Sequence, residues 1–258
     1  MGDWNSKQYL KFEGQRTRPS VDLIRNIPVL NPRNILDVGC GPGNSTAELY
    51  KNFPKSKIVG IDSSEDMLMR AEAAYSNLKF LKCSVPNELE RIEEKFDIIY
   101  SNACIHWIPN QELLLKALMD KLAAGGALAV QIPVIQKAPF YEMLGKVLTQ
   151  DKWRDKLGGI KNFHNLLPEE YYDILSGLTD NFELWETVYY HKVSDFGDII
   201  EWYKGSGLRP YLEALSDNER AEFESDILSR IKQMYNRQAD GNIILKMPRL
   251  FFVAQKIK

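Results

Sequence analysis

The segment that decides the fold reads Ile35-Leu36-Asp37-Val38-Gly39-Cys40-Gly41-Pro42-Gly43-Asn44-Ser45-Thr46. It begins as a short apolar run, passes through three glycines at alternate positions and ends where a helical pattern starts. Glycines at such a turn allow the backbone to bend sharply, and they allow a ligand to approach it without a Cβ in the way. The first N–H groups of the following helix are free to bind polar atoms. The segment therefore predicts a ligand-binding loop between a buried strand and a helix.

Two acidic residues define the ligand more closely. Asp62 directly follows the next apolar run, where an acidic residue is placed to accept both hydroxyls of a ribose. Asp37 precedes the loop, where its charge would repel a pyrophosphate but suits a ligand that carries an ammonium and a sulfonium. A dinucleotide loop also requires a small residue where this chain has Asn44. These features favour S-adenosylmethionine (SAM) over NAD, so an NAD-dependent oxidoreductase is the disfavoured alternative.

Short apolar runs alternate with helical patterns in the first half of the chain. The predicted strands are 34–38, 57–61, 78–83, 96–100 and 127–132, and the predicted helices are 45–53, 64–75 and 111–124. Each run is apolar enough to be covered on both faces, which indicates parallel strands with helices on both sides of the sheet. We expect a capping box at Ser63 and Asp66 and a helix end at Gly125.

The pattern changes after Pro133. Residues 139–178 are mostly helical, and two late strands over 182–193 and 243–257 enclose a helical insertion at 195–237 with a capping box at Ser216 and Glu219. We therefore expect one α/β domain over 1–258. It would comprise an N-terminal cover segment (1–33), a SAM-binding core (34–132), and helical substrate-side elements or a lid at 139–178 and 195–237.

Composition excludes several classes of protein. The 258 residues are 44% hydrophobic and 26% charged, as in a globular protein with a sizeable core. A net charge of −2 gives no electrostatic reason to expect nucleic acid or a membrane as a partner. No apolar run is long enough for a membrane span, and the first residues lack the pattern of a signal peptide. Three cysteines without a Cys-x-x-Cys pair indicate neither a disulfide framework nor a zinc site, so we expect a cytoplasmic protein.

The motif Asp37–Gly43, followed by Gly60–Ser64, resembles that of the class I SAM-dependent methyltransferases. More narrowly, the chain is similar over nearly its whole length to the bacterial family of trans-aconitate 2-methyltransferases. The similarity is carried by Asp3-Trp4-Asn5, Tyr9-Leu10, Arg16-x-Arg18-Pro19, Pro42-Gly43-Asn44-Ser45-Thr46, Tyr171-Tyr172-Asp173-Ile174-Leu175, Tyr189-Tyr190-His191, Gly207-Leu208-Arg209-Pro210 and Pro248-Arg249-Leu250-Phe251. The later segments are the more specific ones, because the superfamily as a whole does not share them.

The resemblance implies a Rossmann-like fold with a seven-stranded, mostly parallel sheet, an antiparallel last strand, and SAM as the cofactor. The cofactor-binding residues that it implies are Asp37, Gly39, Gly41, Gly43, Asp62, Ser63, Met67, Ser84, Val85 and Trp107. Ser84 stands where many members of the family have an acidic residue, so contact with the adenine amino group falls to its hydroxyl or backbone. Met67 and Trp107 have core packing as an equal alternative. His106, beside Trp107, is a candidate general base.

The implied reaction is methylation of a carboxylate oxygen of a small polycarboxylic acid, trans-aconitate, giving a monomethyl ester and S-adenosylhomocysteine. A carboxylate with a pKa near ~4 is already ionised at neutral pH, so we expect no catalytic acid or base and no metal. Arginine binds carboxylates through two parallel hydrogen bonds. The substrate-binding candidates are Arg16, Arg18, Arg209 and Arg249, with Tyr9, Tyr189 and Tyr190 as hydroxyl donors.

Two alternatives remain open on the sequence. One is a methyltransferase that acts on another small acid or on a carrier-bound acyl group. The other is a non-catalytic regulator that binds SAM and transfers nothing. The expected partners are a small-molecule polycarboxylate and SAM, in a monomer or weak homo-oligomer.

Overall fold

The structure is a computed structural model that describes residues 13–160 and 163–257, with side chains from Thr17 onward. The chain divides into two compact units. Within the described residues, the first comprises 14–133, 163–187 and 249–257 and is called the sheet unit here. The second comprises 134–160 and 188–248 and is called the helical unit. The helical region that the sequence predicts over 139–178 therefore has residues in both units.

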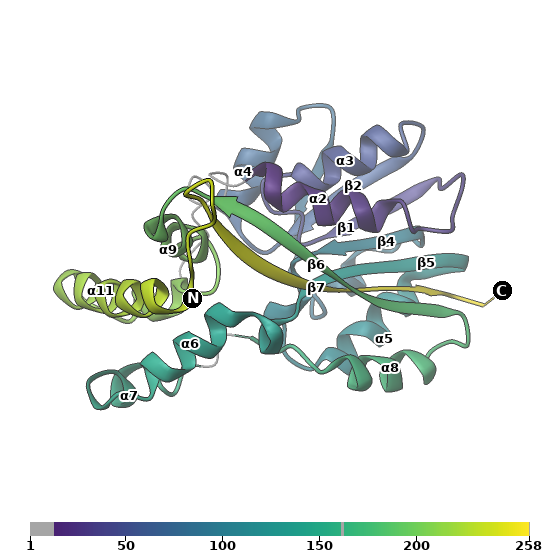
Figure 1. Ribbon diagram of the computed structural model, residues 1–258. Coiled ribbons are helices and arrows are strands. Elements are labelled where there is room, and N and C mark those ends of the chain that lie inside the picture. Colours follow the sequence, from purple (N-terminus) through teal and green to yellow (C-terminus); the bar gives the residue numbers. More distant parts are fainter. Residues whose placement is uncertain (1–12, 161–162, 258) are drawn as a thin grey trace. The chain divides into compact units, whose positions relative to one another are not determined.

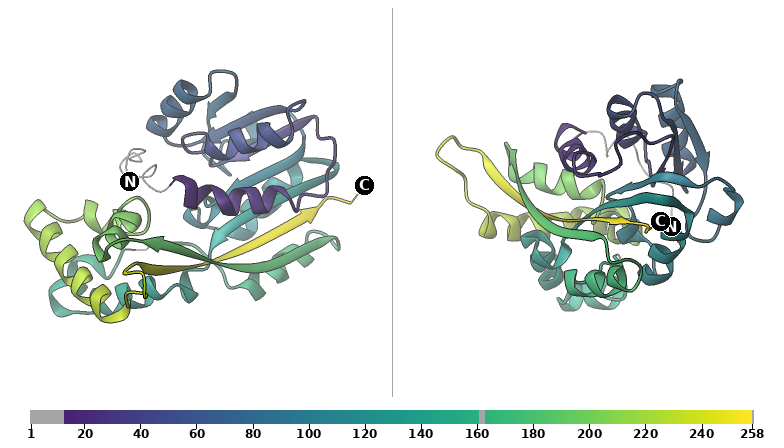
Figure 2. Two further views of the ribbon diagram at one scale, coloured as in Figure 1. Left: turned by 45° about the horizontal axis from the view of Figure 1, so that its top comes forward. Right: turned by 90° about the vertical axis from the view of Figure 1, so that its right-hand side faces the viewer.

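Seven strands form one sheet. They are β1 (Asn34–Val38), β2 (Lys57–Asp62), β3 (Lys79–Lys82), β4 (Phe96–Asn102), β5 (Leu122–Pro133), β6 (Phe182–Val193) and β7 (Ile243–Gln255), in the order β3-β2-β1-β4-β5-β7-β6 (Figure 1). β1 pairs in parallel with β2 and β4, β2 with β3, and β4 with β5, whereas β7 is antiparallel to β5. The expected seven-stranded, mostly parallel sheet with an antiparallel last strand is confirmed. Figure 2 shows β6 and β7 side by side, and both strands have residues in each unit.

Helices cover both faces of the sheet within the sheet unit. They are α2 (Glu13–Ile24), α3 (Asn44–Asn52), α4 (Glu65–Ala74), α5 (Gln111–Lys121) and α8 (Pro168–Ser176). On one face the buried Tyr100 hydroxyl of β4 lies 2.7 Å from the Ser20 hydroxyl of α2. On the other face Tyr171 of α8 packs against Phe252 of β7 and donates to the Gln111 side chain of α5. Figure 1 shows α2 and α8 on opposite sides of β4 and β5.

Two helix ends differ from the sequence prediction. α4 begins at Glu65 with Ser64, not Ser63, as its cap, because the Ser64 hydroxyl accepts the Met67 N–H (3.3 Å). The expected capping box at Ser63 is therefore wrong by one residue. α5 ends at Lys121, before the predicted Ala124, because Leu122 already begins β5. Leu122 fits the leucine spacing of the helix, but it belongs to β5, where a buried strand also requires an apolar residue.

The helical unit packs around aromatic side chains. Its helices are α6 (Pro139–Leu148), α7 (Asp151–Leu157), α9 (Phe196–Lys204), α10 (Arg209–Glu213) and α11 (Asp217–Met234), and α11 begins with the expected capping box. Phe140 stacks on Tyr203, and Trp153 packs edge-on against Phe223. The Trp153 indole also donates to Asp226 (2.8 Å), so the polar edge of the buried ring is satisfied. In the described part of the chain, no helix is both long and apolar enough to cross a bilayer.

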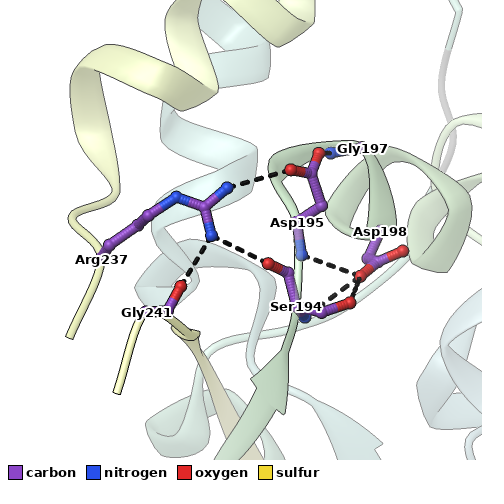
Figure 3. Close-up of polar contacts among 6 residues, drawn as sticks. All are labelled: Ser194, Asp195, Gly197, Asp198, Arg237 and Gly241. Atoms are coloured by element: carbon purple, nitrogen blue, oxygen red, sulfur yellow. Dashed lines mark hydrogen bonds and ion pairs between the residues drawn. The ribbon is translucent and has the colours of Figure 1, made fainter. Parts of the chain in front are cut away.

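Arg237 joins three chain segments of the helical unit (Figure 3). Its guanidinium donates to the carbonyls of Ser194 (2.9 Å) and Gly241 (2.6 Å) and pairs with the Asp195 carboxylate (3.0 Å). Asp198 in turn accepts from the Ser194 hydroxyl (2.7 Å) at the start of α9. The contacts fix the end of β6 and the start of α9 against the residues that lead into β7.

Candidate functional site

The glycine loop connects β1 to α3 at the carboxyl end of the sheet. Gly39, Gly41 and Gly43 all have positive φ, at 73°, 54° and 91°. The N–H groups of Gly39 and Cys40 donate to the Ile61 carbonyl of β2 (2.8 and 3.0 Å). The loop is therefore held to the neighbouring strand in a conformation that L-residues rarely adopt.

The three glycines differ in what a side chain would meet. A Cβ on Gly39 would lie 2.1 Å from the Cys104 Sγ, and a Cβ on Gly43 would lie 2.8 Å from the Tyr75 ring. A Cβ on Gly41 would have no described heavy atom within 4 Å. The loop is thus closely packed at both ends and open at its centre, where a ligand can approach the backbone.

Asp62 ends β2 beside the open part of the loop. Its Oδ2 accepts the Gly41 N–H (2.9 Å), and its Oδ1 accepts the Ser64 N–H (2.9 Å). The side chain is only partly buried. A carboxylate offers about four acceptor positions, which is more than these two backbone N–H groups occupy.

Asp37 is fully buried beneath the same loop. Its Oδ2 accepts from the hydroxyls of Ser45 (2.6 Å) and Thr46 (2.7 Å) in the first turn of α3, while its buried Oδ1 has no hydrogen-bond partner among the residues described. Burial raises the pKa of Asp37 to about 6, although both hydroxyls act to lower it and Asp62 raises it further. Asp37 therefore holds α3 to β1. This role of Ser45 and Thr46 was not predicted from the sequence, although both residues belong to the segment that decides the fold.

The two carboxylates give the loop a negative environment. Burial first, and then the charges of Asp37 and Asp62, raise the pKa of the Cys40 and Cys104 thiols. Both thiols consequently stay protonated at neutral pH. Such a site favours a positively charged ligand and disfavours a pyrophosphate.

The residues expected around the adenine follow β2 and β3. Met67 is buried in the first turn of α4, whereas Ser63 and Ser84 are exposed and Val85 is half-buried. The Ser84 N–H donates to the Glu88 carboxylate (2.8 Å). The carboxylate of Glu88, which was not predicted as a site residue, therefore lies beside Ser84.

His106 and Trp107 follow β4 in a short 3-10 turn, η2 (Ile105–Trp107). The buried His106 ring stacks on Phe163 with centroids 5.6 Å apart, and Trp107 lies 4.7 Å from Phe163. Burial, and then the charge of Arg249, lower the pKa of His106 to about 3. The imidazole is therefore neutral and a poor general base at physiological pH. Phe163 was not predicted, because a residue distant in sequence gives no signal of this contact.

A row of polar side chains follows one face of the sheet at the same edge. Asn102 of β4 is the register partner of Gln131 of β5, and Pro133 of β5 is opposite Arg249 of β7. Because strand side chains alternate between faces, Asn102, Gln131 and Arg249 project from one face. Of these three residues, only Arg249 was predicted from the sequence. The available signal for Gln131 was a polar residue inside a strand that is otherwise apolar.

The N-terminal substrate candidates lie partly beyond the described residues. Tyr9 and the side chain of Arg16 belong to that part of the chain. Arg18 in α2 is largely exposed and lies 4.0 Å from Asp22. Within residues 13–160 and 163–257, no group of three His, Cys, Asp or Glu side chains could hold a metal ion.

The remaining candidates belong to the helical unit. Arg209 begins α10 and donates to Glu213 (2.6 Å), and its side chain is mostly buried. Tyr189 is buried, whereas its neighbour Tyr190 is 66% exposed, because adjacent residues of β6 point to opposite faces. The two hydroxyls therefore do not point the same way. The substrate candidates with described side chains divide between the two units.

Several known proteins are similar to this chain over nearly its whole length. Residues 32–177 match the family described as "Methyltransferase domain". The chain is 40% identical to trans-aconitate 2-methyltransferase of Rhodopseudomonas palustris (strain BisB5), over 99% of this chain and 100% of the relative. It is 39% identical to trans-aconitate 2-methyltransferase of Agrobacterium fabrum (strain C58 / ATCC 33970), over 98% and 99%.

Solved structures share the fold at low sequence identity. The YcgJ protein of Bacillus subtilis superposes with a TM-score of 0.62 at 13% identity, over 93% of this chain and 99% of that one. A phosphoethanolamine N-methyltransferase 2 of Haemonchus contortus, solved in complex with S-adenosyl-L-methionine, gives 0.57 at 16% identity, over 97% and 56%. At these identities the likeness concerns the architecture.

Proposed function

Since this chain belongs to the family of bacterial trans-aconitate 2-methyltransferases, we propose that it methylates a carboxylate oxygen of a small polycarboxylic acid, with SAM as methyl donor. Trans-aconitate is the proposed substrate, because the relatives that match over the full length carry that name. The products would be a monomethyl ester and S-adenosylhomocysteine.

The acidic glycine loop is the observation that carries the cofactor assignment. When bound, SAM supplies a methyl group on a positively charged sulfur. Asp37 and Asp62 make the loop negative, which suits the sulfonium and ammonium and opposes the pyrophosphate of NAD. Asp62 would hold the ribose while its oxygens also bind Gly41 and Ser64, and the open side of Gly41 leaves room for the ligand.

The chain's own residues need to position the substrate rather than move protons. A carboxylate is ionised at neutral pH and requires no base, and a neutral His106 is suited to packing rather than to proton transfer. Placing two reacting groups about 3–3.5 Å apart can by itself supply several kcal/mol. Arg249 supplies the charge that a carboxylate needs in a water-poor site. The aromatic rings of Trp107 and Phe163 help to exclude water there.

Replacing the ribose-binding acid tests the cofactor site. We expect Asp62→Ala to weaken binding of SAM and of S-adenosylhomocysteine by about 1.5–3 kcal/mol, because hydrogen bonds to a charged acceptor are lost. Isothermal titration calorimetry measures both affinities. Asp66→Ala serves as the control, because Asp66 pairs with Arg70 on α4. Equal affinities in the Asp62 variant and the wild type would remove Asp62 from the site.

The proposed reaction is tested by mass spectrometry of the purified protein with SAM and a panel of dicarboxylic and tricarboxylic acids. The expected result is a monomethyl ester, formed fastest from trans-aconitate. Methylation of a carrier-bound acyl group instead would overturn the substrate assignment and leave the cofactor assignment intact. Tight SAM binding with no transfer to any acid would favour the non-catalytic regulator.

We also propose a cytoplasmic protein that acts as a monomer or weak homo-oligomer on a small molecule. The compartment is supported by Cys40, Cys83 and Cys104, which are all free thiols. Free thiols are typical of proteins in a reducing compartment. Cell fractionation and light scattering after size-exclusion chromatography test the two parts separately.

A further inference from the structure

Several buried polar groups lie around the end of β5, and most of them were not among the site residues predicted from the sequence. Gln131 is 1% exposed, and its amide Nε2 has no hydrogen-bond partner within the described residues. The Oδ1 of its register partner Asn102, the Nδ1 of His106 and the Oδ1 of Asn165 are also buried without a partner in that part of the chain. A buried polar group without a partner destabilises the fold, and native proteins keep such groups chiefly where function requires them.

These groups are held in place by backbone contacts at the end of the sheet. The Asn165 Nδ2 donates to the Pro133 carbonyl (2.8 Å), and the Gln131 carbonyl accepts the Ala103 N–H (2.8 Å). Arg249 is the register partner of Pro133 and is close enough to affect His106 electrostatically. One cation and several uncharged amides therefore occupy the same edge of the sheet.

The chemistry of this set fits a ligand with more than one carboxylate. A guanidinium binds one carboxylate through two parallel hydrogen bonds, so a second carboxylate needs other donors. The Gln131 amide is such a donor. The oxygen and nitrogen of the Asn102 amide exchange by a rotation of its terminal group, so Asn102 can present a donor too. Uncharged donors satisfy an anion without burying a further cation.

One of the three carboxylates of trans-aconitate receives the methyl group. We propose that Arg249 holds one of the other two and that Gln131, with Asn102 beside it, binds the remaining one. The inference rests on the proposed function and adds to it a residue that distinguishes substrates by their number of carboxylates. Gln131 is then a specificity residue: a substrate that lacks the second carboxylate leaves its amide unpaired and is bound more weakly.

Gln131→Met tests the proposal, because methionine has a similar length and lacks the donor. We expect the KM for trans-aconitate to rise about 10- to 100-fold, with SAM affinity unchanged. The tricarboxylate preference, measured as the kcat/KM ratio between trans-aconitate and a dicarboxylate analogue, should fall by a similar factor. The Tm should stay equal or rise, because an unpaired buried amide is removed. Gln131→Glu, which places an anion against the substrate carboxylate, should raise KM further.

Gln111→Met is the matched control. Gln111 is equally buried in the sheet unit, but its amide donates to the Ile105 and Ile108 carbonyls (2.8 and 2.5 Å). Its replacement should lower the Tm and leave the tricarboxylate preference unchanged, because these hydrogen bonds hold the turn at 105–108 and do not depend on the number of substrate carboxylates. Calorimetric SAM titration reports on the fold of each variant independently of the acid substrate.

The possible results distinguish a failure of the role of Gln131 from a failure of the proposed function. If the wild type methylates trans-aconitate and Gln131→Met lowers the Tm without raising KM, Gln131 is structural and the inference is overturned. The same holds if Gln131→Met keeps the wild-type tricarboxylate preference. If the wild type methylates no polycarboxylate, the proposed function fails and this inference fails with it.

Discussion

Asp37 is a carboxyl group kept away from water at the point where β1 meets the glycine loop. Desolvation opposes its ionisation, whereas the hydroxyls of Ser45 and Thr46 favour it. The balance puts its pKa at about 6, so the group changes charge just below neutral pH. In the unfolded chain the same carboxyl has an ordinary pKa of about 3.8. Folding stability must therefore depend on pH through this residue.

The sign of that dependence is fixed by the raised pKa. Between about pH 4 and 6 the native Asp37 holds a proton that the unfolded chain has released, so acidification favours the folded state through this group. Relative to Asp37→Asn, the wild type should gain about 2 kcal/mol of unfolding free energy between pH 7 and pH 4.5. Urea unfolding at each pH measures this difference. The exposed Asp120→Asn is the control, and a pH-independent difference between wild type and Asp37→Asn would contradict the prediction.

His106 predicts the pH dependence of turnover. Because burial lowers its pKa to about 3, the imidazole does not titrate in the working range, and an ionised carboxylate needs no base. We expect kcat to be flat between about pH 6.5 and 8.5 in the wild type and in His106→Gln, and unchanged by EDTA. Single-turnover rates with saturating trans-aconitate and SAM make the measurement. If kcat instead fell below about pH 6.5 in the wild type but not in His106→Gln, His106 would be the general base.

The loop between β1 and α3 predicts opposite behaviour for two of its glycines. In Gly39→Ala the new Cβ would overlap Cys104, so we expect a loss of more than about 3 kcal/mol of stability. In Gly41→Ala only the positive φ is strained, at about 1–2 kcal/mol, but the methyl group enters the open side of the loop. That variant should fold and bind SAM at least about tenfold more weakly.

Thermal unfolding and calorimetry separate these effects on the glycine loop. Gly145→Ala in α6 is the control, since a Cβ there meets no described atom within 4 Å and alanine favours the helix. It should raise stability slightly and leave SAM affinity unchanged. Wild-type SAM affinity in Gly41→Ala would show that the ligand does not approach the loop at its centre.

Sequence patterns located the elements well where a single physical demand acted on each residue. The strands over 34–38 and 182–193 have the predicted bounds. The first is a buried apolar run, and the second is a long run of β-branched and aromatic residues. The end of α5 was misplaced, because Leu122 satisfies a helix face and a buried strand equally well. The cap of α4 was misplaced by one, because Ser63 and Ser64 have the same capping chemistry. The contacts of Ser64 with Met67 and Asp62 distinguish them only in the structure.

The candidate site was predictable to the extent that it is local in sequence. Gly39, Gly41, Gly43 and Asp62 follow two successive strands, so the motif alone places them at one edge of the sheet. Gln131 belongs to the same edge only through strand register, which a single sequence does not reveal. For the same reason, the proximity of Arg249 to His106 could not be foreseen from two positions so far apart in the chain.

At the scale of the molecule, the expected cofactor residues and the expected substrate residues are distributed differently. All ten cofactor candidates belong to the sheet unit, including Asp37, Asp62 and Trp107. The substrate candidates include Arg249 in the sheet unit and Tyr189, Tyr190 and Arg209 in the helical unit. Each ligand should therefore leave its own pattern of altered backbone protection along the chain.

Hydrogen–deuterium exchange tests this distribution. A ligand at 100 times its Kd stabilises the folded state by about 2.7 kcal/mol, which slows exchange through the openings that release it about 100-fold. S-adenosylhomocysteine alone should slow exchange at 38–46 and 60–67 and leave α9, α10 and α11 unchanged. Adding trans-aconitate should further slow 102–107 and 130–133. Asp62→Ala, at the same ligand concentration, should lose the first effect.

The helical unit gives the decisive comparison in that experiment. Slower exchange at 189–190 and 209 on adding trans-aconitate is the result that the resemblance implies for Tyr189, Tyr190 and Arg209. Unchanged exchange there, together with slower exchange at 102–107, would remove these three residues from the substrate set. It would leave Arg249, Gln131 and the remaining N-terminal candidates to bind the carboxylates. Equal protection of α9–α11 by S-adenosylhomocysteine alone would contradict a cofactor site built from the sheet unit.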